Sequence, residues 1–367
     1  MAMLNAVLRT FCKQTVGRYQ HVSALTGSSS VPVRWIKTNS KLLSSVQQVQ
    51  VVDGGKKLNV TWDDGKSFDF HSIWLRFQCP CSNCREESSG LFRTRPADIP
   101  LGLKIKDAVK TDNGDVQVQW KEEQHHGHFS QDFLHQHIYS KDQLQAKKEV
   151  SRPVFKRSDG CGTLNEDGLA KLSGGSYGER LLSNFSPRFD ENVRGGVTRF
   201  LDMYQVLSKF RVEHPNEFKT LCRVPISIQM EYENSDYPVL MSKRRPMIYL
   251  DDYGDVISVV WHTYMHAPLE VPEEDVEEFY NAYQLLGRAV EFSEDAIDTK
   301  LKPGEVIAFN NRRMLHARSA YEEGGSGKRH FQGGYLSGDD FKSRLLVLAK
   351  KMGDPRPAIR IGNNDWR

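Results

Sequence analysis

Three of the six cysteines in this 367-residue chain lie within six residues of one another: Cys79, Cys81 and Cys84. Six cysteines are too few for a disulfide scaffold at this length, which is typical of a reducing compartment, where clustered thiolates favour Zn²⁺. A tetrahedral zinc site needs a fourth ligand, and the segment EEQHHGHF supplies histidines. His125 lies four residues before Phe129 and shares a strand face with it, whereas His126 and His128 would point the other way. We therefore predict a structural zinc site made by these three cysteines and His125; the alternative is three unligated cysteines at a strand–turn boundary.

A second group of residues, near the C-terminus, could bind a metal ion and a carboxylate. In the run AFNNRRMLHARSAYEEGGSGKRHFQGGYL, His316 lies in a loop after one strand-like segment, and Arg329 lies on the next segment. An imidazole can ligate a metal, and a guanidinium can hold a carboxylate through two parallel hydrogen bonds. Each residue also has an ordinary interpretation, because a lone histidine is more often structural and a single strand arginine is often a surface cation.

The cysteine cluster is surrounded by segments that are patterned as antiparallel strands. Residues 46–76 alternate apolar and polar side chains and contain turn signals at Gly54–Gly55 and Asp64–Gly65. Residues 116–134 repeat the order of a strand, a Trp, a polar turn and a second strand. These two units predict a small zinc-binding β domain over residues 46–140.

The rest of the chain is expected to hold a charged linker, two helical regions and several strands. Lys141–Val150 is charged, and residues 151–197 are rich in Gly, Ser and charge without a sustained period, so 141–197 is expected to be irregular. The spacing of apolar residues from Phe200 to Phe210 predicts a helix, and Pro272 with acidic residues after it predicts the start of another. Strands are expected at about 225–231, 246–250, 256–262, 305–311 and 328–336.

The first 52 residues differ in charge from everything that follows. They contain six basic residues and no acidic one, so the remainder has 44 basic and 47 acidic residues, although the whole chain carries +3. A basic amphipathic segment followed by Ser-rich sequence is typical of a mitochondrial transit peptide, which we expect over residues 1–45. The alternative is a disordered basic tail, and the protein would then be located in the cytoplasm. Nothing downstream continues the positive charge, and no apolar run is long enough to cross a bilayer, so neither a nucleic-acid partner nor membrane insertion is expected.

The two motifs together resemble a known family. WLRFQCPCSNC followed by NNRRMLHARSAYE and KRHFQGGY is similar to the gamma-butyrobetaine dioxygenase and trimethyllysine dioxygenase family, over about 58–140 and 196–350. The resemblance implies a mainly β fold, with a zinc domain before a double-stranded β-helix (jelly-roll) of the TauD/TfdA type that has flanking helices. It places that oxygenase domain at 198–350 and a tail at 351–367. It also implies hydroxylation of a trimethylammonium carboxylic acid, as in L-carnitine synthesis, by Fe(II), O₂ and 2-oxoglutarate, with ascorbate as reductant and a homodimer as the assembly. The CPC spacing favours the butyrobetaine branch.

The resemblance also implies residue roles. The three clustered cysteines and His125 match the zinc ligands, His316 matches the distal histidine of the iron site, and Arg329 matches the arginine that holds 2-oxoglutarate. Tyr335 matches an aromatic residue that faces the quaternary ammonium of the substrate, where cation–π attraction operates.

The sequence departs from this family at the iron site. A facial triad needs a His-x-Asp or His-x-Glu besides the distal histidine, yet none of the twelve histidines is followed two residues later by Asp or Glu. In the family this motif precedes the segment that corresponds to Gly195–Thr198, so an internal deletion within the irregular 151–197 interval would explain both features. A skipped exon or an erroneous gene model is favoured over an evolved pseudoenzyme. We therefore weigh two hypotheses, an oxygenase and a non-catalytic product that is stabilised by zinc.

Two smaller departures concern the substrate. Residues 310–313 read Asn-Asn-Arg-Arg where the family has Asp-Asn-Trp-Arg, and Trp261 and His262 replace an Asn-Asn pair that contacts the substrate carboxylate. His262 and His266 would share a strand face if the strand continued, but we interpret both as structural.

Overall fold

The computed structural model describes most of the chain between residues 45 and 353. The described ranges are 45–86, 92–151, 180–188, 194–232, 239–263, 265–301, 305, 307–322 and 330–353. The expected transit peptide lies outside these residues, apart from Ser45, and so does the expected C-terminal tail beyond residue 353. Residues 351 and 352, expected in that tail, instead end a helix that covers Gly338–Met352. In the described part, no helix is both long and apolar enough to cross a bilayer.

The N-terminal part consists of two three-stranded antiparallel sheets, as the hairpin patterns predict. The first sheet contains β1 (Val46–Val52), β2 (Lys57–Trp62) and β3 (Ser67–His71), and the second contains β4 (Ile105–Lys110), β5 (Val116–Trp120) and β6 (His126–Phe129). Alternate residues are buried along β2 and β5, so that each sheet places one face in the core. Short helices α2 (Ser72–Phe77) and α3 (Gln131–Gln136) follow the sheets.

Lys141–Ser151 forms helix α4, so the expectation of a charged linker is wrong at this position. The segment contains neither Gly nor Pro, and its lysines reach acidic residues near the start of a later helix. The Nζ atom of Lys141 lies 3.0 Å from Oε1 of Glu274, and the Nζ atom of Lys147 lies 2.5 Å from Oε1 of Glu270. The high charge of this segment therefore reflects an exposed helix that is held by ion pairs.

The irregular segment that the sequence predicted also contains regular structure. Strand β7 covers Arg180–Arg188, and β8 covers Arg194–Gly195. Residues 152–179 and 189–193 lie outside the described part.

Helices and short strands alternate in the second half. The helices are α6 (Met203–Glu213), α7 (Pro215–Arg223), α8 (Glu273–Glu291) and α9 (Gly338–Met352). Pro272 precedes α8, and three acidic residues occupy its first turn, as predicted. The predicted helix from Phe200 to Phe210 begins later than expected, because Phe200 lies on strand β9 (Thr198–Asp202). The Asp202 side chain accepts a hydrogen bond from the Tyr204 backbone amide and so caps the start of α6.

The strands of the second half form several small sheets. They are β10 (Pro225–Tyr232), β11 (Val239–Pro246), β12 (Ile248–Leu250), β13 (Val256–Val259), β14 (Ile297–Thr299), β15 (Ala308–Asn310), β16 (Met314–Arg318), β17 (Tyr321–Glu322) and β18 (His330–Ser337). Two of the sheets have three strands, in the orders β14-β9-β16 and β15-β7-β18, and the remaining strands pair in twos. The fold is mainly β, and a closed double-stranded β-helix stays a prediction.

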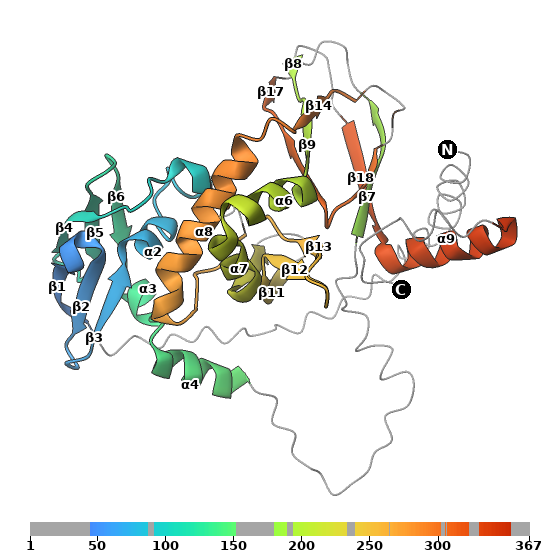
Figure 1. The fold of residues 1–367 in the computed structure, drawn as a ribbon. Helices are drawn as coiled ribbons and strands as arrows, with labels where there is room; N and C mark the ends of the chain where they lie inside the picture. Colours follow the sequence, from blue (N-terminus) through green and yellow to red (C-terminus); the bar gives the residue numbers. More distant parts are fainter. Residues whose placement is uncertain are drawn as a thin grey trace, which may run out of the picture.

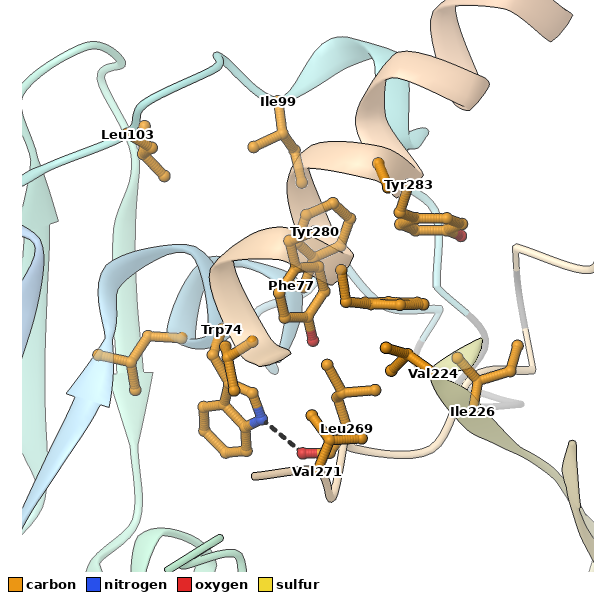
Figure 2. Close-up of a cluster of buried hydrophobic side chains, with 14 of the residues drawn as sticks. Trp74, Phe77, Ile99, Leu103, Val224, Ile226, Leu269, Val271, Tyr280 and Tyr283 are labelled. Carbon is orange, nitrogen blue, oxygen red and sulfur yellow. Dashed lines mark hydrogen bonds between the residues drawn. The ribbon is translucent and has the colours of Figure 1, made fainter. Parts of the chain in front are cut away.

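Helix α8 joins the two halves of the molecule and lies between the N-terminal sheets and the remaining strands (Figure 1). Figure 2 shows Phe77 of α2 beside Tyr280 of α8, with Trp74 donating to the carbonyl of Leu269. The Phe77 and Tyr280 rings stack with their centroids 4.6 Å apart. The side-chain amide of Gln284 donates to the carbonyl of Ile99 at 2.7 Å. One hydrophobic core therefore extends from the first strand into α8.

Candidate metal centre and binding pocket

The three clustered cysteines lie in a turn directly after helix α2. Gln78 ends that helix, and the amides of Cys84 and Arg85 both donate to the carbonyl of Cys81 at 2.9 Å. His125 immediately precedes β6, on which Phe129 is buried while His126 and His128 are exposed. The alternation along β6 therefore places His125, rather than its neighbours, at the cysteine turn.

The four side chains converge around a single point. The Nε2 atom of His125 lies 3.2 Å from the Sγ atom of Cys79, 3.8 Å from that of Cys81 and 3.5 Å from that of Cys84. All four ligand atoms lie within 4.8 Å of one another. A tetrahedral ion with ordinary zinc bond lengths separates sulfur and nitrogen ligands by about 3.5 Å. The donor set therefore fits Zn²⁺ in both chemistry and spacing.

The protonation of two of these groups suits a metal ligand. A hydrogen bond between Cys79 and Cys84 lowers the pKa of the Cys84 thiol and raises that of the Cys79 thiol, and the nearby Arg76 also lowers the pKa of Cys84. Burial lowers the pKa of His125, which keeps its imidazole neutral at pH 7, as metal ligation requires.

Arg76 and Glu123 support this cluster, and sequence reasoning missed both of them. The Nη1 atom of Arg76 lies 3.2 Å from the Sγ atom of Cys84, and its guanidinium also pairs with the carboxylate of Glu123 through two hydrogen bonds. The Arg76 side chain is only 6% exposed, so the pair orients the ligands from within the core. The two residues are 47 positions apart, and no local pattern links them.

His316 lies on strand β16, not in the loop that the sequence predicted. It is opposite Phe200 of β9, and its ring is 5.0 Å from that of Phe309. The His316 side chain lines a pocket of about 990 Å³, which also has Trp261 and His262 in its wall. This volume is within the range of small-molecule sites.

Among the described residues, those around His316 do not fit an iron centre. A facial triad requires a second histidine and a carboxylate beside it. In the part of the chain that the structure describes, the zinc-type cluster is the only group of three or more His, Cys, Asp or Glu side chains that could hold a metal ion. Within the described ranges, His316 therefore lines a pocket to which no second histidine and carboxylate bring the other two ligands of an iron site.

The other two predicted site residues are less fully placed. Arg329 lies outside the described residues. Tyr335 is on β18, opposite Leu182 of β7, and so belongs to a different sheet from His316. The roles of both residues stay predictions.

The structural interpretation of His266 stays a prediction, because its buried Nε2 atom has no hydrogen-bond partner among the described residues. His266 is bridged to Ile228 of β10, and its ring lies 5.2 Å from that of Tyr283. His262 lines the same pocket as His316. Strand β13 ends at Val259, so it does not continue through His262 and His266.

Two family models match this chain in the same order as its two halves. The model described as "Gamma-butyrobetaine hydroxylase-like, N-terminal" matches residues 49–135, and "Taurine catabolism dioxygenase TauD, TfdA family" matches residues 185–335. The first range contains the cysteine cluster with His125, and the second contains His316.

Curated relatives match over most of the chain. Gamma-butyrobetaine dioxygenase of a Pseudomonas species is 26% identical over 80% of this chain and 94% of its own length. Human gamma-butyrobetaine dioxygenase is 23% identical over 84% of this chain and 98% of its own length. Trimethyllysine dioxygenase of the yeast Meyerozyma guilliermondii is 22% identical over 80% and 94%. The alignment with the human enzyme has 385 positions, whereas 84% of 367 residues is about 308. About 77 of its positions therefore have no residue from this chain.

Proposed function

This chain belongs to the family of 2-oxoglutarate-dependent oxygenases that includes gamma-butyrobetaine dioxygenase and trimethyllysine dioxygenase, and on that premise we propose a function in two parts. The complete enzyme hydroxylates gamma-butyrobetaine to L-carnitine with Fe(II), O₂ and 2-oxoglutarate. The form given by this sequence keeps the zinc module and the pocket but does not hold catalytic iron. The observation that carries the second part is the isolation of His316 from any other metal-ligating pair in the described residues.

The zinc module supports the butyrobetaine branch. Its four ligands lie within the matched N-terminal family model, and their spacing fits a tetrahedral ion. The zinc would be held by Cys79, Cys81, Cys84 and His125, and it would fix the turn after α2. Because Phe77 and Gln78 at this turn contact Tyr280, the ion would also support the packing of α8.

The missing iron ligands and the unmatched alignment positions support one explanation. Roughly 70 to 80 positions of the curated gamma-butyrobetaine dioxygenases find no residue here, although the alignments reach nearly the full length of those enzymes. We propose that the unmatched positions include the His-x-Asp segment, between the zinc module and β9.

The test combines metal content with turnover. The chain is purified with Zn²⁺ and Fe(II) supplied, and 2-oxoglutarate consumption is followed with gamma-butyrobetaine or trimethyllysine. We expect one equivalent of zinc, no stoichiometric iron and no consumption. A chimera in which residues 151–194 are replaced by the corresponding segment of the Pseudomonas enzyme should bind iron and hydroxylate gamma-butyrobetaine.

Three outcomes would contradict parts of this proposal. Stoichiometric iron and turnover in the unaltered chain would refute the loss of the iron site. An iron-loaded chimera that acts only on trimethyllysine would favour the second candidate substrate, which the yeast relative supports. A chimera that binds iron but consumes no 2-oxoglutarate with either substrate would refute the assignment of the reaction.

We also propose a mitochondrial location. The support is the basic, acid-free N-terminal segment together with similarity to bovine and chicken trimethyllysine dioxygenases whose names specify the mitochondrion. The cytoplasm is the second candidate. Fusion of residues 1–52 to a fluorescent protein tests the choice, since a diffuse cytoplasmic signal would refute the import proposal.

A further inference from the structure

We propose that Lys243, Arg245 and Arg312 form a binding site for a small carboxylate or phosphate anion in the wall of the His316 pocket. All three residues line this pocket. The site requires no iron, so its test is separate from that of the hydroxylation.

Two of the cations come from one face of strand β11. Lys243 is paired in register with Ile228 of β10, and Arg245 with Ile226, so the two side chains share a face. Arg244 lies between them on the opposite face, where its guanidinium donates to the carbonyl of Glu270 at 2.7 Å. The strand therefore directs alternate cations into the pocket and to the outer side.

The third cation comes from the turn between β15 and β16. The Arg312 amide donates to Asn310 Oδ1 at 2.9 Å, and its carbonyl accepts from the Val259 amide at 2.9 Å. The Arg312 Nη1 atom lies 3.4 Å from the hydroxyl oxygen of Ser258 on β13. These contacts hold the guanidinium toward the same wall as the β11 pair.

The charge of the lining favours an anion. The two acidic residues in its described lining are both engaged by arginines, with Asp298 held by Arg199 through hydrogen bonds of 2.7 and 2.8 Å and Glu291 paired with Arg95. Burial is the largest cause that lowers the pKa of Lys243, and repulsion from the charges of Arg245 and Arg312 lowers it further. This repulsion indicates that the three cations lie near one another. An anion between them would relieve this repulsion.

Arg245 supplies a donor that has no acceptor. Its guanidinium lies over the ring of Tyr249, 4.5 Å from the ring centroid, and its Nε atom is buried without a hydrogen-bond partner in the part of the chain that the structure describes. A buried donor that lacks an acceptor destabilises the folded state, and a carboxylate or phosphate oxygen is the acceptor that a guanidinium binds best. A quaternary ammonium has no acceptor atom and would be repelled by this wall.

The test measures anion binding by the full chain, loaded with zinc and without added iron. Succinate, inorganic phosphate and tetramethylammonium are titrated separately by calorimetry at fixed ionic strength. We expect saturable binding of succinate or phosphate, and the tighter of the two identifies the carboxylate or phosphate class. Arg312→Gln should weaken this binding at least about tenfold, the effect of losing a charge-assisted hydrogen bond. Arg245→Gln should do the same if it folds.

Arg244→Gln is the matched control, because it removes the same charge from the same strand on the opposite face. Its affinity should stay within about twofold of that of the unaltered chain. The proposal is overturned by an unchanged affinity in Arg312→Gln, by an equal loss in Arg244→Gln, or by binding of tetramethylammonium alone. It is also overturned if neither anion binds, or if only Arg329→Gln removes the binding.

Discussion

At the scale of single residues, the zinc site depends on ligands that only the folded chain brings together. Cys81 is one of three cysteines in a turn of six residues, and His125 reaches them from the position directly before β6. We predict that Cys81→Ala loses stoichiometric zinc and lowers the free energy of unfolding by about 3 kcal/mol or more, because binding of a structural zinc contributes directly to folding. Zinc content by mass spectrometry and thermal unfolding by circular dichroism measure the two effects.

Cys222→Ala is the control for this substitution. Cys222 lies in α7, away from the cluster, and burial raises the pKa of its thiol to about 11. This variant should keep one equivalent of zinc. Retention of full zinc in Cys81→Ala as well would show that Cys81 is not a ligand.

At the scale of elements, α8 determines how the two halves of the molecule pack. Tyr280 is 3% exposed, and its ring stacks on Phe77 with an angle of 13° between the planes. We predict that Tyr280→Ala destabilises the protein by about 3 to 5 kcal/mol, the usual effect of removing a buried aromatic ring. Chemical denaturation measures this loss.

The same helix supplies the control for that variant. Phe292 immediately follows α8 and is 73% exposed, so Phe292→Ala should change the stability by less than about 0.5 kcal/mol. Similar losses in the two variants would indicate that aromatic content, rather than the contact with α2, determines the effect.

The elements also show which features could be predicted from the sequence. The hairpins of the zinc module and the start of α8 follow from local patterns, namely strand alternation, turn glycines and Pro272 before acidic residues. His125 could be chosen because strand periodicity extends over four residues. Helix α4 was missed because its ion pairs are with residues more than 120 positions away. The wall of Lys243, Arg245 and Arg312 was missed because it requires β11 and a distant turn to meet.

At the scale of the whole molecule, the two matched family regions share one core. Trp74 donates to the carbonyl of Leu269, Lys57 pairs with Glu273 at 2.5 Å, and the N-terminal strands and α8 belong to one buried cluster. Two regions that share a core are expected to unfold together. Zinc removal should therefore destabilise the helices of the second half as well as the N-terminal sheets.

Thermal unfolding with two probes tests this coupling. The chain has six tryptophans, so Trp35, Trp261 and Trp366 are first replaced by Phe, and fluorescence then reports on Trp62, Trp74 and Trp120 in the N-terminal part. Circular dichroism at 222 nm reports mainly on the helices of the second half, α6, α7, α8 and α9. We expect one coincident transition by both probes, and a shift of both to lower temperature when zinc is chelated, because the ion stabilises only the folded state. If chelation shifted the fluorescence transition alone, the zinc module would be an independent unit, and α8 would not transmit its stability to the pocket.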